Sequence, residues 1–183
     1  MADARVKIPA ELFAVAESSH FGGEFTRGPL DVGADELAFD GPLSWQVDIT
    51  NTDGALLVMG SVQARAHVAC ARCLDDVALD LDGQIEGWFQ LSADAAAPDY
   101  VDEDEIEVLP ADHIIDLEPL IMAALILELP NPPLCRQDCK GLCPRCGANL
   151  NEGECNCCAT DAFEEFNRAA NPFAALADYD FGE

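Results

Sequence analysis

The chain has 183 residues, half of them hydrophobic, which is enough for one sizeable core and excludes a disordered acidic tail. Nine Lys and Arg stand against 35 Asp and Glu, giving a formal net charge of −26 at pH 7. Such a surface repels a phosphate backbone, so extensive contact with nucleic acid is not expected unless the few cations cluster.

The acidity has two interpretations that the sequence leaves open. It is either a docking feature or a solubility device, for example an adaptation of a whole proteome to high salt. The acids gather in the middle of the chain, where residues 74–135 contain 16 carboxylates and no Lys or Arg. The cations Arg136, Lys140 and Arg145 follow directly after this stretch.

The N-terminal residues and the apolar runs predict a cytoplasmic protein. Residues 1–9 contain neither the apolar region nor the cleavage pattern of a signal peptide. The longest apolar run, residues 117–129, is shorter than the roughly 20 residues that span a bilayer, and Glu118, Pro119 and Glu128 interrupt it. We therefore expect no membrane partner, and thiols that are reduced or metal-bound.

A strand-rich region is predicted to begin near residue 37. Residues 37–39 and 43–50 read as strands, and residues 51–54, Asn-Thr-Asp-Gly, read as a turn. Apolar and polar side chains alternate in the next two runs, 55–70 and 74–91, with Gly83 predicting a bulge or bend. These runs predict an antiparallel sheet with short connections.

The second half of the chain is predicted to add a loop, a short strand and a buried helix. Residues 92–104 are acidic and Ala-rich, typical of a loop, and 106–109 fit one more strand. A helix is expected over 116–129, with Asp116 as its N-cap and prolines ending it. Because the helix is apolar on nearly all sides, it should be buried. After the cysteines, Asp161 and Glu164 resemble a capping pair for another helix.

These elements predict an α+β fold. A mainly antiparallel β-sheet or partial barrel is packed by one buried helix, followed by a cysteine-rich, zinc-ribbon-like segment and short C-terminal helices. The predicted division is a β-rich core domain over residues 1–134, a zinc-binding segment over 135–158 and a helical tail over 159–183.

Seven of the nine cysteines lie between residues 135 and 158. In the motif Cys143-Pro-Arg-Cys146-Gly147, two intervening residues let both sulfurs face one ion, and the glycine can take the positive φ of the following turn. Disulfides are the alternative, but they need an oxidising compartment, to which the chain shows no route. Zinc is therefore the predicted cofactor, with one or two structural ions, because a closed all-thiolate site is not catalytic.

Two sets of four cysteines are candidates for these sites. The first set is Cys143, Cys146, Cys155 and Cys157. The second set joins Cys70 and Cys73, at a strand end, to Cys135 and Cys139. A single site from Cys135, Cys139, Cys143 and Cys146 competes with both, and Cys158 is left over in either case.

The sequence shows no catalytic constellation, and an enzyme is not expected. None of the three histidines lies at metal-ligand spacing, and His67 is expected to be an exposed bystander on the polar face of its strand. The sequence also lacks a nucleophile–base pair and a Gly-rich phosphate loop. One enzymatic alternative is a thiol redox or metal-handling protein that uses Cys70 and Cys73.

Several motifs together carry a resemblance to a known family. They are Cys70-Ala-Arg-Cys73-Leu74 after a strand, Ile115-Asp-Leu-Glu-Pro-Leu120 leading a helix to Leu-Glu-Leu-Pro-Asn-Pro-Pro133, the cysteine segment with Cys143-Pro-Arg-Cys146-Gly-Ala-Asn-Leu-Asn151, and Asn171-Pro-Phe-Ala-Ala-Leu176. In this order the chain resembles the YceD-like large ribosomal RNA subunit accumulation protein family over roughly its last two thirds.

The resemblance implies a bacterial, cytoplasmic, non-enzymatic factor for large-subunit biogenesis that supports accumulation of 23S rRNA. It carries no catalytic residue over. Together with the charge, it favours a factor that binds a basic ribosomal protein or a pre-50S particle through its acidic middle. The alternative is a zinc ribbon that makes limited contact with rRNA through Arg136, Lys140 and Arg145.

Overall fold

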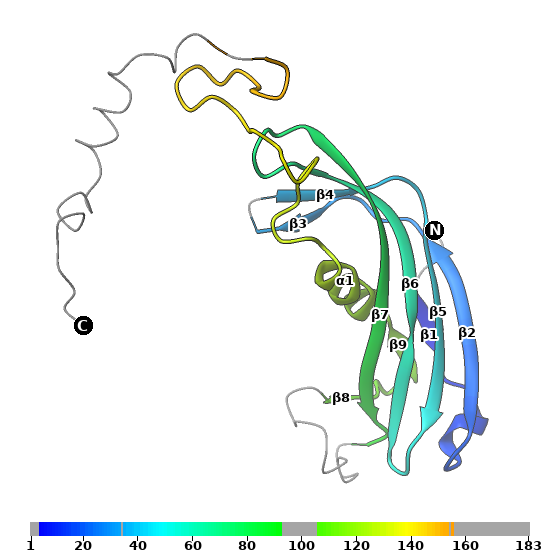
Figure 1. Cartoon of the computed structure of the whole chain (residues 1–183). Helices are drawn as coiled ribbons and strands as arrows, with labels where there is room; N and C mark the ends of the chain where they lie inside the picture. Colours follow the sequence, from blue (N-terminus) through cyan, green and yellow to red (C-terminus); the bar gives the residue numbers. More distant parts are fainter. Residues whose placement is uncertain (1–3, 34, 93–105, 154, 156–183) are drawn as a thin grey trace, which may run out of the picture.

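Alternating apolar and polar side chains build a long, curved antiparallel sheet in the computed structural model (Figure 1). The structure describes residues 4–33, 35–92, 106–153 and 155. Its strands are β1 (Arg5–Lys7), β2 (Ser18–Phe25), β3 (Leu30–Val32), β4 (Asp35–Phe39), β5 (Leu43–Asn51), β6 (Ala55–Ala69), β7 (Asp76–Gln90), β8 (Ile106–Val108) and β9 (Ile114–Asp116). A 3₁₀ turn η1 (Ala10–Phe13) and the helix α1 (Glu118–Leu127) complete the described elements.

The strand β6 is the centre of the sheet. It pairs with β7 along one side, and with β5 and then β4 along the other. The order continues outward from β5 to β2, and from β4 to β3. β8 adds to β7 in the parallel direction, and β1 with β9 forms a separate two-stranded sheet. β6 and β7, with 15 residues each, form the longest hairpin of the sheet, and residues 70–75 connect them at one end.

One face of the sheet and the helix α1 enclose the core. Most apolar residues of β5 and β6, from Leu43 to Val68, are buried on this face, while Met59, Gln63 and Arg65 are exposed on the other. On α1 the buried side chains are Ile121, Met122, Ala124 and Leu125. Figure 1 shows the helix lying against β7 and β6. The sheet therefore has one covered face and one polar face.

The predicted strands of residues 37–91 and the strand beginning at Ile106 are confirmed. The turn at Asn51–Gly54 is also confirmed, since the Thr52 N–H donates to the Ala55 carbonyl at 2.8 Å. The predicted bulge at Gly83 is wrong, because β6 and β7 stay in continuous register through Val62↔Gly83. Gly83 instead provides space for the helix: a Cβ there would lie 2.8 Å from the carbonyl carbon and oxygen of Ala124.

The predicted helix exists, but it begins at Glu118 and ends at Leu127. The Asp116 carboxylate accepts the Glu118 N–H at 3.0 Å, although Leu117 occupies the N-cap position. Burial on nearly all sides is not observed, since Leu127 is 82% exposed. The reason is that α1 packs on the sheet along one face, which buries Leu125 and leaves Leu127 on the opposite side.

Several other expectations have different outcomes. The strands β1, β2 and β3 were not anticipated, and β8 is parallel to its neighbour instead of antiparallel. The partial barrel is not confirmed, and the short C-terminal helices of residues 159–183, with Asp161 and Glu164, lie outside the described residues. The domain boundaries at 134 and 158 stay a prediction. Among the described residues, no helix is long and apolar enough to cross a bilayer.

Gly83→Ala is expected to destabilise the fold. The added methyl would meet the backbone of α1, which cannot rotate away, so we expect a loss of about 1–3 kcal/mol in the free energy of unfolding. Gly28→Ala is the control, because a Cβ at Gly28 meets nothing within 4 Å. Urea denaturation of both variants measures the difference, and equal stability of the two would contradict this account of the helix–sheet contact.

Candidate metal centre

Four cysteines from two distant parts of the chain meet at the end of the β6–β7 hairpin. Their sulfurs, from Cys70, Cys73, Cys135 and Cys139, all lie within 4.8 Å of one another. The Sγ atoms of Cys70 and Cys139 are 3.8 Å apart, and those of Cys73 and Cys135 are 3.5 Å apart. A tetrahedron with metal–sulfur bonds of about 2.3 Å has edges of about 3.8 Å. The four sulfurs, which we name cluster one, could therefore hold a metal ion.

The backbone of the hairpin turn shapes cluster one. The Leu74 N–H donates to the Cys70 carbonyl at 2.9 Å, and Leu74 takes a positive φ of 63°, so the chain turns back within a few residues. The segment after α1 is bonded to this turn through Ala71 N–H to the Pro133 carbonyl at 2.9 Å and Cys135 N–H to the Cys70 sulfur at 3.3 Å. These bonds bring the two cysteine pairs together.

Burial and hydrogen bonding set the ionisation of these thiols. Cys70, Cys73 and Cys139 are almost fully buried, whereas Cys135 is exposed. Burial opposes ionisation of Cys70, but backbone hydrogen bonds, led by that from Arg72, outweigh it and lower its pKa to about 6. The pKa of Cys139 is lowered by the side-chain hydrogen bond of Asn151, while burial raises that of Cys73. Two of the four sulfurs thus favour the thiolate form, which is the form that binds metals.

Three further cysteines form a second group, cluster two. The sulfurs of Cys143, Cys146 and Cys155 lie within 4.8 Å of one another. Gly147 has a φ of 72°, and its N–H donates to the Cys143 carbonyl at 2.8 Å, so this turn needs the conformation that glycine adopts without strain. This group could also hold a metal ion.

Two asparagines connect cluster two to cluster one. The Asn151 amide donates to the Cys139 sulfur at 3.4 Å, and its oxygen accepts the Lys140 N–H at 2.9 Å. The Asn149 amide donates to both oxygens of Asp75 at 3.1 Å, and Asp75 in turn accepts from the Cys73 thiol at 3.2 Å. The segment between Cys146 and Cys155 therefore supplies hydrogen bonds that support the cysteines of cluster one.

The structure brings together each member of the predicted second set of four, and three members of the first set. Cys157, the expected fourth member of that first set, and Cys158 lie outside the described residues. Cys135 and Cys139 lie in one group and Cys143 and Cys146 in the other, which differs from the single-site alternative. The metal-binding role of all eight cysteines stays a prediction.

The sequence reasoning assigned no role to the polar supports of cluster one. Asp75, Asn149 and Asn151 carry out this role, and Arg72 adds a bond from its guanidinium to the Cys139 carbonyl at 2.9 Å. The available signal was the pair of asparagines inside the cysteine loop. Spacing alone could not show that they reach back across the hairpin.

The three cations predicted to contact rRNA, Arg136, Lys140 and Arg145, lie in the segment that carries the cysteine clusters. Arg136 already has partners within the chain. It donates to the Asn151 side chain at 2.6 Å and lies 3.6 Å from Asp138. Lys140 and Arg145 are exposed. His67, expected to be a bystander, is hydrogen-bonded to Asp76 at 2.6 Å, and this bond raises its pKa.

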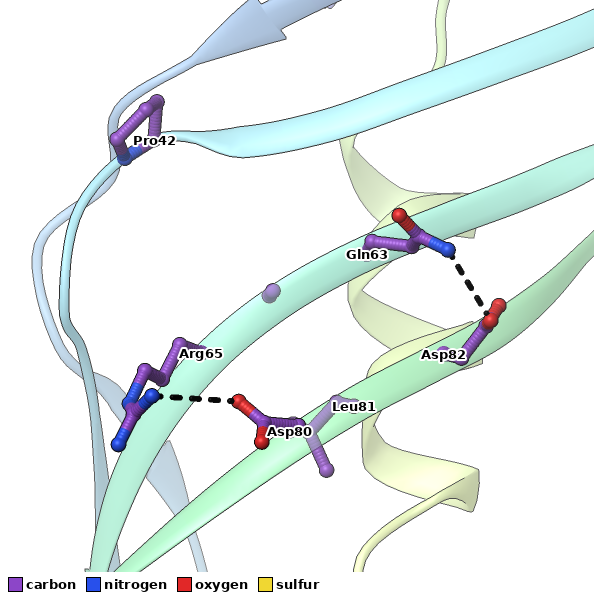
Figure 2. A pocket seen from close by; sticks show the side chains of 7 residues that line it. Pro42, Gln63, Arg65, Asp80, Leu81 and Asp82 are labelled. Carbon is purple, nitrogen blue, oxygen red and sulfur yellow. Dashed lines mark hydrogen bonds and ion pairs between the residues drawn. The ribbon is translucent and has the colours of Figure 1, made fainter.

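A polar hollow lies on the face of the β6–β7 hairpin that α1 does not cover. Figure 2 shows Arg65 directed at Asp80 and Gln63 directed at Asp82, across the β6–β7 register. The Gln63 amide donates to Asp82 at 3.2 Å, and the Arg65 guanidinium is 3.8 Å from Asp80. Because these groups satisfy one another, the hollow is a weaker candidate site than the cysteine clusters.

Comparison with known families finds a match over most of the chain. The family described as "Large ribosomal RNA subunit accumulation protein YceD" matches residues 58–179. That range contains β6 from Val58 onward, β7, the helix α1 and all nine cysteines. No solved structure matches the chain.

Curated relatives match over different lengths. An uncharacterized protein of Mycobacterium tuberculosis H37Rv is 33% identical over 144 residues, which cover 78% of this chain and 65% of that protein. The "Large ribosomal RNA subunit accumulation protein YCED homolog 1, chloroplastic" of Arabidopsis thaliana is 38% identical over 76 residues, 42% of this chain and 22% of the relative. The maize protein with that name is 29% identical over 142 residues, 63% of this chain and 48% of the relative. The chain thus spans about two thirds, or less, of the length of these relatives.

Asn151→Ala is expected to weaken metal binding at cluster one. The substitution removes the hydrogen bond to the Cys139 sulfur that favours its thiolate, and losses of supporting contacts typically cost about 10–100-fold in affinity. Competition for Zn²⁺ against a chromophoric chelator measures the change in the full chain. The matched control is Glu152→Ala, an exposed neighbour, and equal affinities in the two variants would contradict the assigned role.

Proposed function

Because the chain belongs to the family of large ribosomal RNA subunit accumulation protein YceD, we propose that it is a non-enzymatic factor for biogenesis of the large ribosomal subunit. In this role it supports accumulation of 23S rRNA in a bacterial cytoplasm. The family match over residues 58–179 is the observation that carries the proposal. The names of the Arabidopsis and maize relatives support it.

The charge distribution supports a basic protein partner, either a free ribosomal protein or one on a pre-50S particle. Along β7, the carboxylates of Asp76, Asp80, Asp82 and Glu86 are exposed on the uncovered side of the sheet. A net charge of −26 favours fast encounter with a cationic partner and opposes approach to a phosphate backbone. Beyond Ser92, the acidic segment predicted as a loop, residues 92–104, lies outside the described part of the chain.

Zinc is the structural ion proposed for both clusters. The sulfurs of cluster one lie within 4.8 Å of one another, with separations of 3.8 and 3.5 Å in two of the pairs, which supports a tetrahedral site, and thiolate sets of this kind are typical of structural zinc. The proposed ligands are Cys70, Cys73, Cys135 and Cys139 in cluster one, and Cys143, Cys146, Cys155 and Cys157 in cluster two. Elemental analysis of reduced protein should find one or two zinc ions per chain, and the absence of bound metal would contradict the proposal.

The main alternative is limited contact with rRNA through the cysteine unit. Four of the nine cations of the chain, Arg72, Arg136, Lys140 and Arg145, lie on or beside the two clusters. Arg72 and Arg136 already hold the unit together, which leaves fewer cations for phosphates. A redox role for Cys70 and Cys73 is less well supported, because both sulfurs lie inside a four-sulfur group.

Affinity capture from the native cell separates these possibilities. The tagged full chain is recovered at moderate salt with and without RNase, and large-subunit ribosomal proteins are identified in both samples. We expect ribosomal proteins to survive RNase treatment. Recovery only without RNase would favour the rRNA alternative, and recovery of no ribosomal component would contradict the proposed function.

Neutralising the acidic residues 102–105 is expected to slow association. Replacing Asp102, Glu103, Asp104 and Glu105 with Asn or Gln removes four charges, and steering by exposed charges acts chiefly on the association rate. We expect slower binding of a captured ribosomal protein at low salt, with thermal stability nearly unchanged. Equal rates for the variant and the parent would show that these acids serve solubility.

A further inference from the structure

The strand β2 ends the hydrogen-bonded order of the main sheet. It pairs with β5 from Ser18↔Thr50 to Phe25↔Leu43, and in the described part of the chain no strand pairs with its other side. Figure 1 shows β2 at the outer edge of the sheet, beside β5. An edge of eight residues is long enough to accept another strand.

Backbone geometry identifies which groups of β2 point away from β5. The Asn51 N–H donates to the Glu17 carbonyl at 3.0 Å, so Glu17 faces β5. In an antiparallel pair this orientation alternates, and Ser19, Phe21 and Gly23 therefore also face β5. The intervening residues direct their N–H and C=O groups outward; they are Ser18, His20, Gly22 and Glu24. Their side chains lie on the uncovered face of the sheet.

This edge lacks the usual protection against strand addition. Natural edges are blocked by proline, lysine or a bulge, and β2 contains no proline or lysine and keeps continuous register with β5. His20 and Glu24 are its ionisable residues.

A buried donor beside the edge also lacks an acceptor. The Trp45 side chain is 7% exposed, and its indole N–H is a buried side-chain group with no hydrogen-bond partner among the described residues. The ring lies against β2: a Cβ on Gly23 would be 3.1 Å from the ring Cζ2 and 3.5 Å from Nε1. Buried N–H groups are normally satisfied, and the described residues contain no acceptor for this one.

Charge decides between two possible occupants of the edge. A second copy could pair β2 with β2, but each copy carries a net charge of −26, which opposes close self-association. A cationic segment is instead attracted. On the uncovered face its side chains would lie beside His20 and Glu24, with Asp48 one strand further in and bonded to His20. On the covered face they would extend the apolar surface of Phe21 and Trp45.

We infer that β2 accepts an extended, cationic segment of a partner protein as an additional strand, with cations on the uncovered face and apolar side chains on the covered face. The inference rests on the proposed function for the identity of the partner as a basic protein. Main-chain hydrogen bonds to the outward groups of β2 would hold the segment, and alternating side chains would select it.

The test uses the full chain and a synthetic peptide of alternating lysine and valine, matched to the eight residues of β2. Two further peptides carry N-methyl groups, one on the lysine amides and one on the valine amides. Both keep the charge, but each blocks hydrogen bonding along one side of the strand. Exactly one side faces β2, so one methylated peptide should bind about tenfold more weakly, or worse, while the other binds like the parent.

A protein variant tests the same edge from the other side. His20→Pro removes an outward N–H without breaking the pairing to β5, and His20→Ala is its matched control because both lose the contact with Asp48. We expect the proline variant to bind the unmethylated peptide about tenfold more weakly than the alanine variant. Circular dichroism checks that both variants are folded. If the proline variant is unfolded, the comparison of the two methylated peptides with the unaltered protein still tests the inference.

Hydrogen exchange locates the binding. The amides of Ser18, His20, Gly22 and Glu24 should exchange fast in the free protein and slow on adding the unmethylated peptide. Equal binding of both methylated peptides, no binding at all, or binding without this protection would overturn the inference. Slow exchange at these amides in a self-associated free protein would overturn the assigned occupant. Capture of ribosomal proteins is measured separately, so the proposed function and the edge can fail independently.

Discussion

The meeting of four sulfurs at the end of the β6–β7 hairpin is the constraint on which the C-terminal half depends. Cys70 and Cys139 are 69 positions apart, and their contact closes a loop that contains β7, β8, β9 and α1. Among residues 134–153, the apolar side chains packed against the sulfurs are Leu134 and Leu142, so the contacts between the sulfurs and the asparagine hydrogen bonds contribute much of the order of this segment. Chains this short of core commonly rely on a structural metal.

The sheet and the cysteine-rich segment differ in charge. The hairpin presents exposed carboxylates along β7, with Arg65 of β6 near Asp80, whereas the cysteine-rich segment contains Arg136, Lys140 and Arg145. Arg72 and Arg136 donate hydrogen bonds to the Cys139 carbonyl and to Asn151, which fixes the positions of their side chains and leaves their charges in place. Acidic and basic side chains therefore gather on different parts of the molecule.

The strands with strict alternation could be predicted from sequence because a half-buried strand imposes that pattern on its residues. β2 could not, since Gly22 and Gly23 and its polar residues give no alternation; it is a strand because β5 offers a partner. Gly83 was misread for a related reason: its lack of a side chain serves the approach of Ala124, a contact that only the tertiary structure defines. The cysteine spacing indicated clusters, but the reach of Asn151 across the hairpin depends on a turn geometry that spacing does not encode.

The length of the β6–β7 ladder has a mechanical consequence. Strands of 15 residues at about 3.3 Å each form a ribbon about 50 Å long, anchored by β5 along its first part and by β4 only at Ala66 and His67. The end that carries Cys70 and Cys73 lies beyond β5 and is held by β4 and by the segment that follows α1. A change in the sulfur group would therefore be felt first at this end of the ribbon, far from the packing around β5 and Ile49.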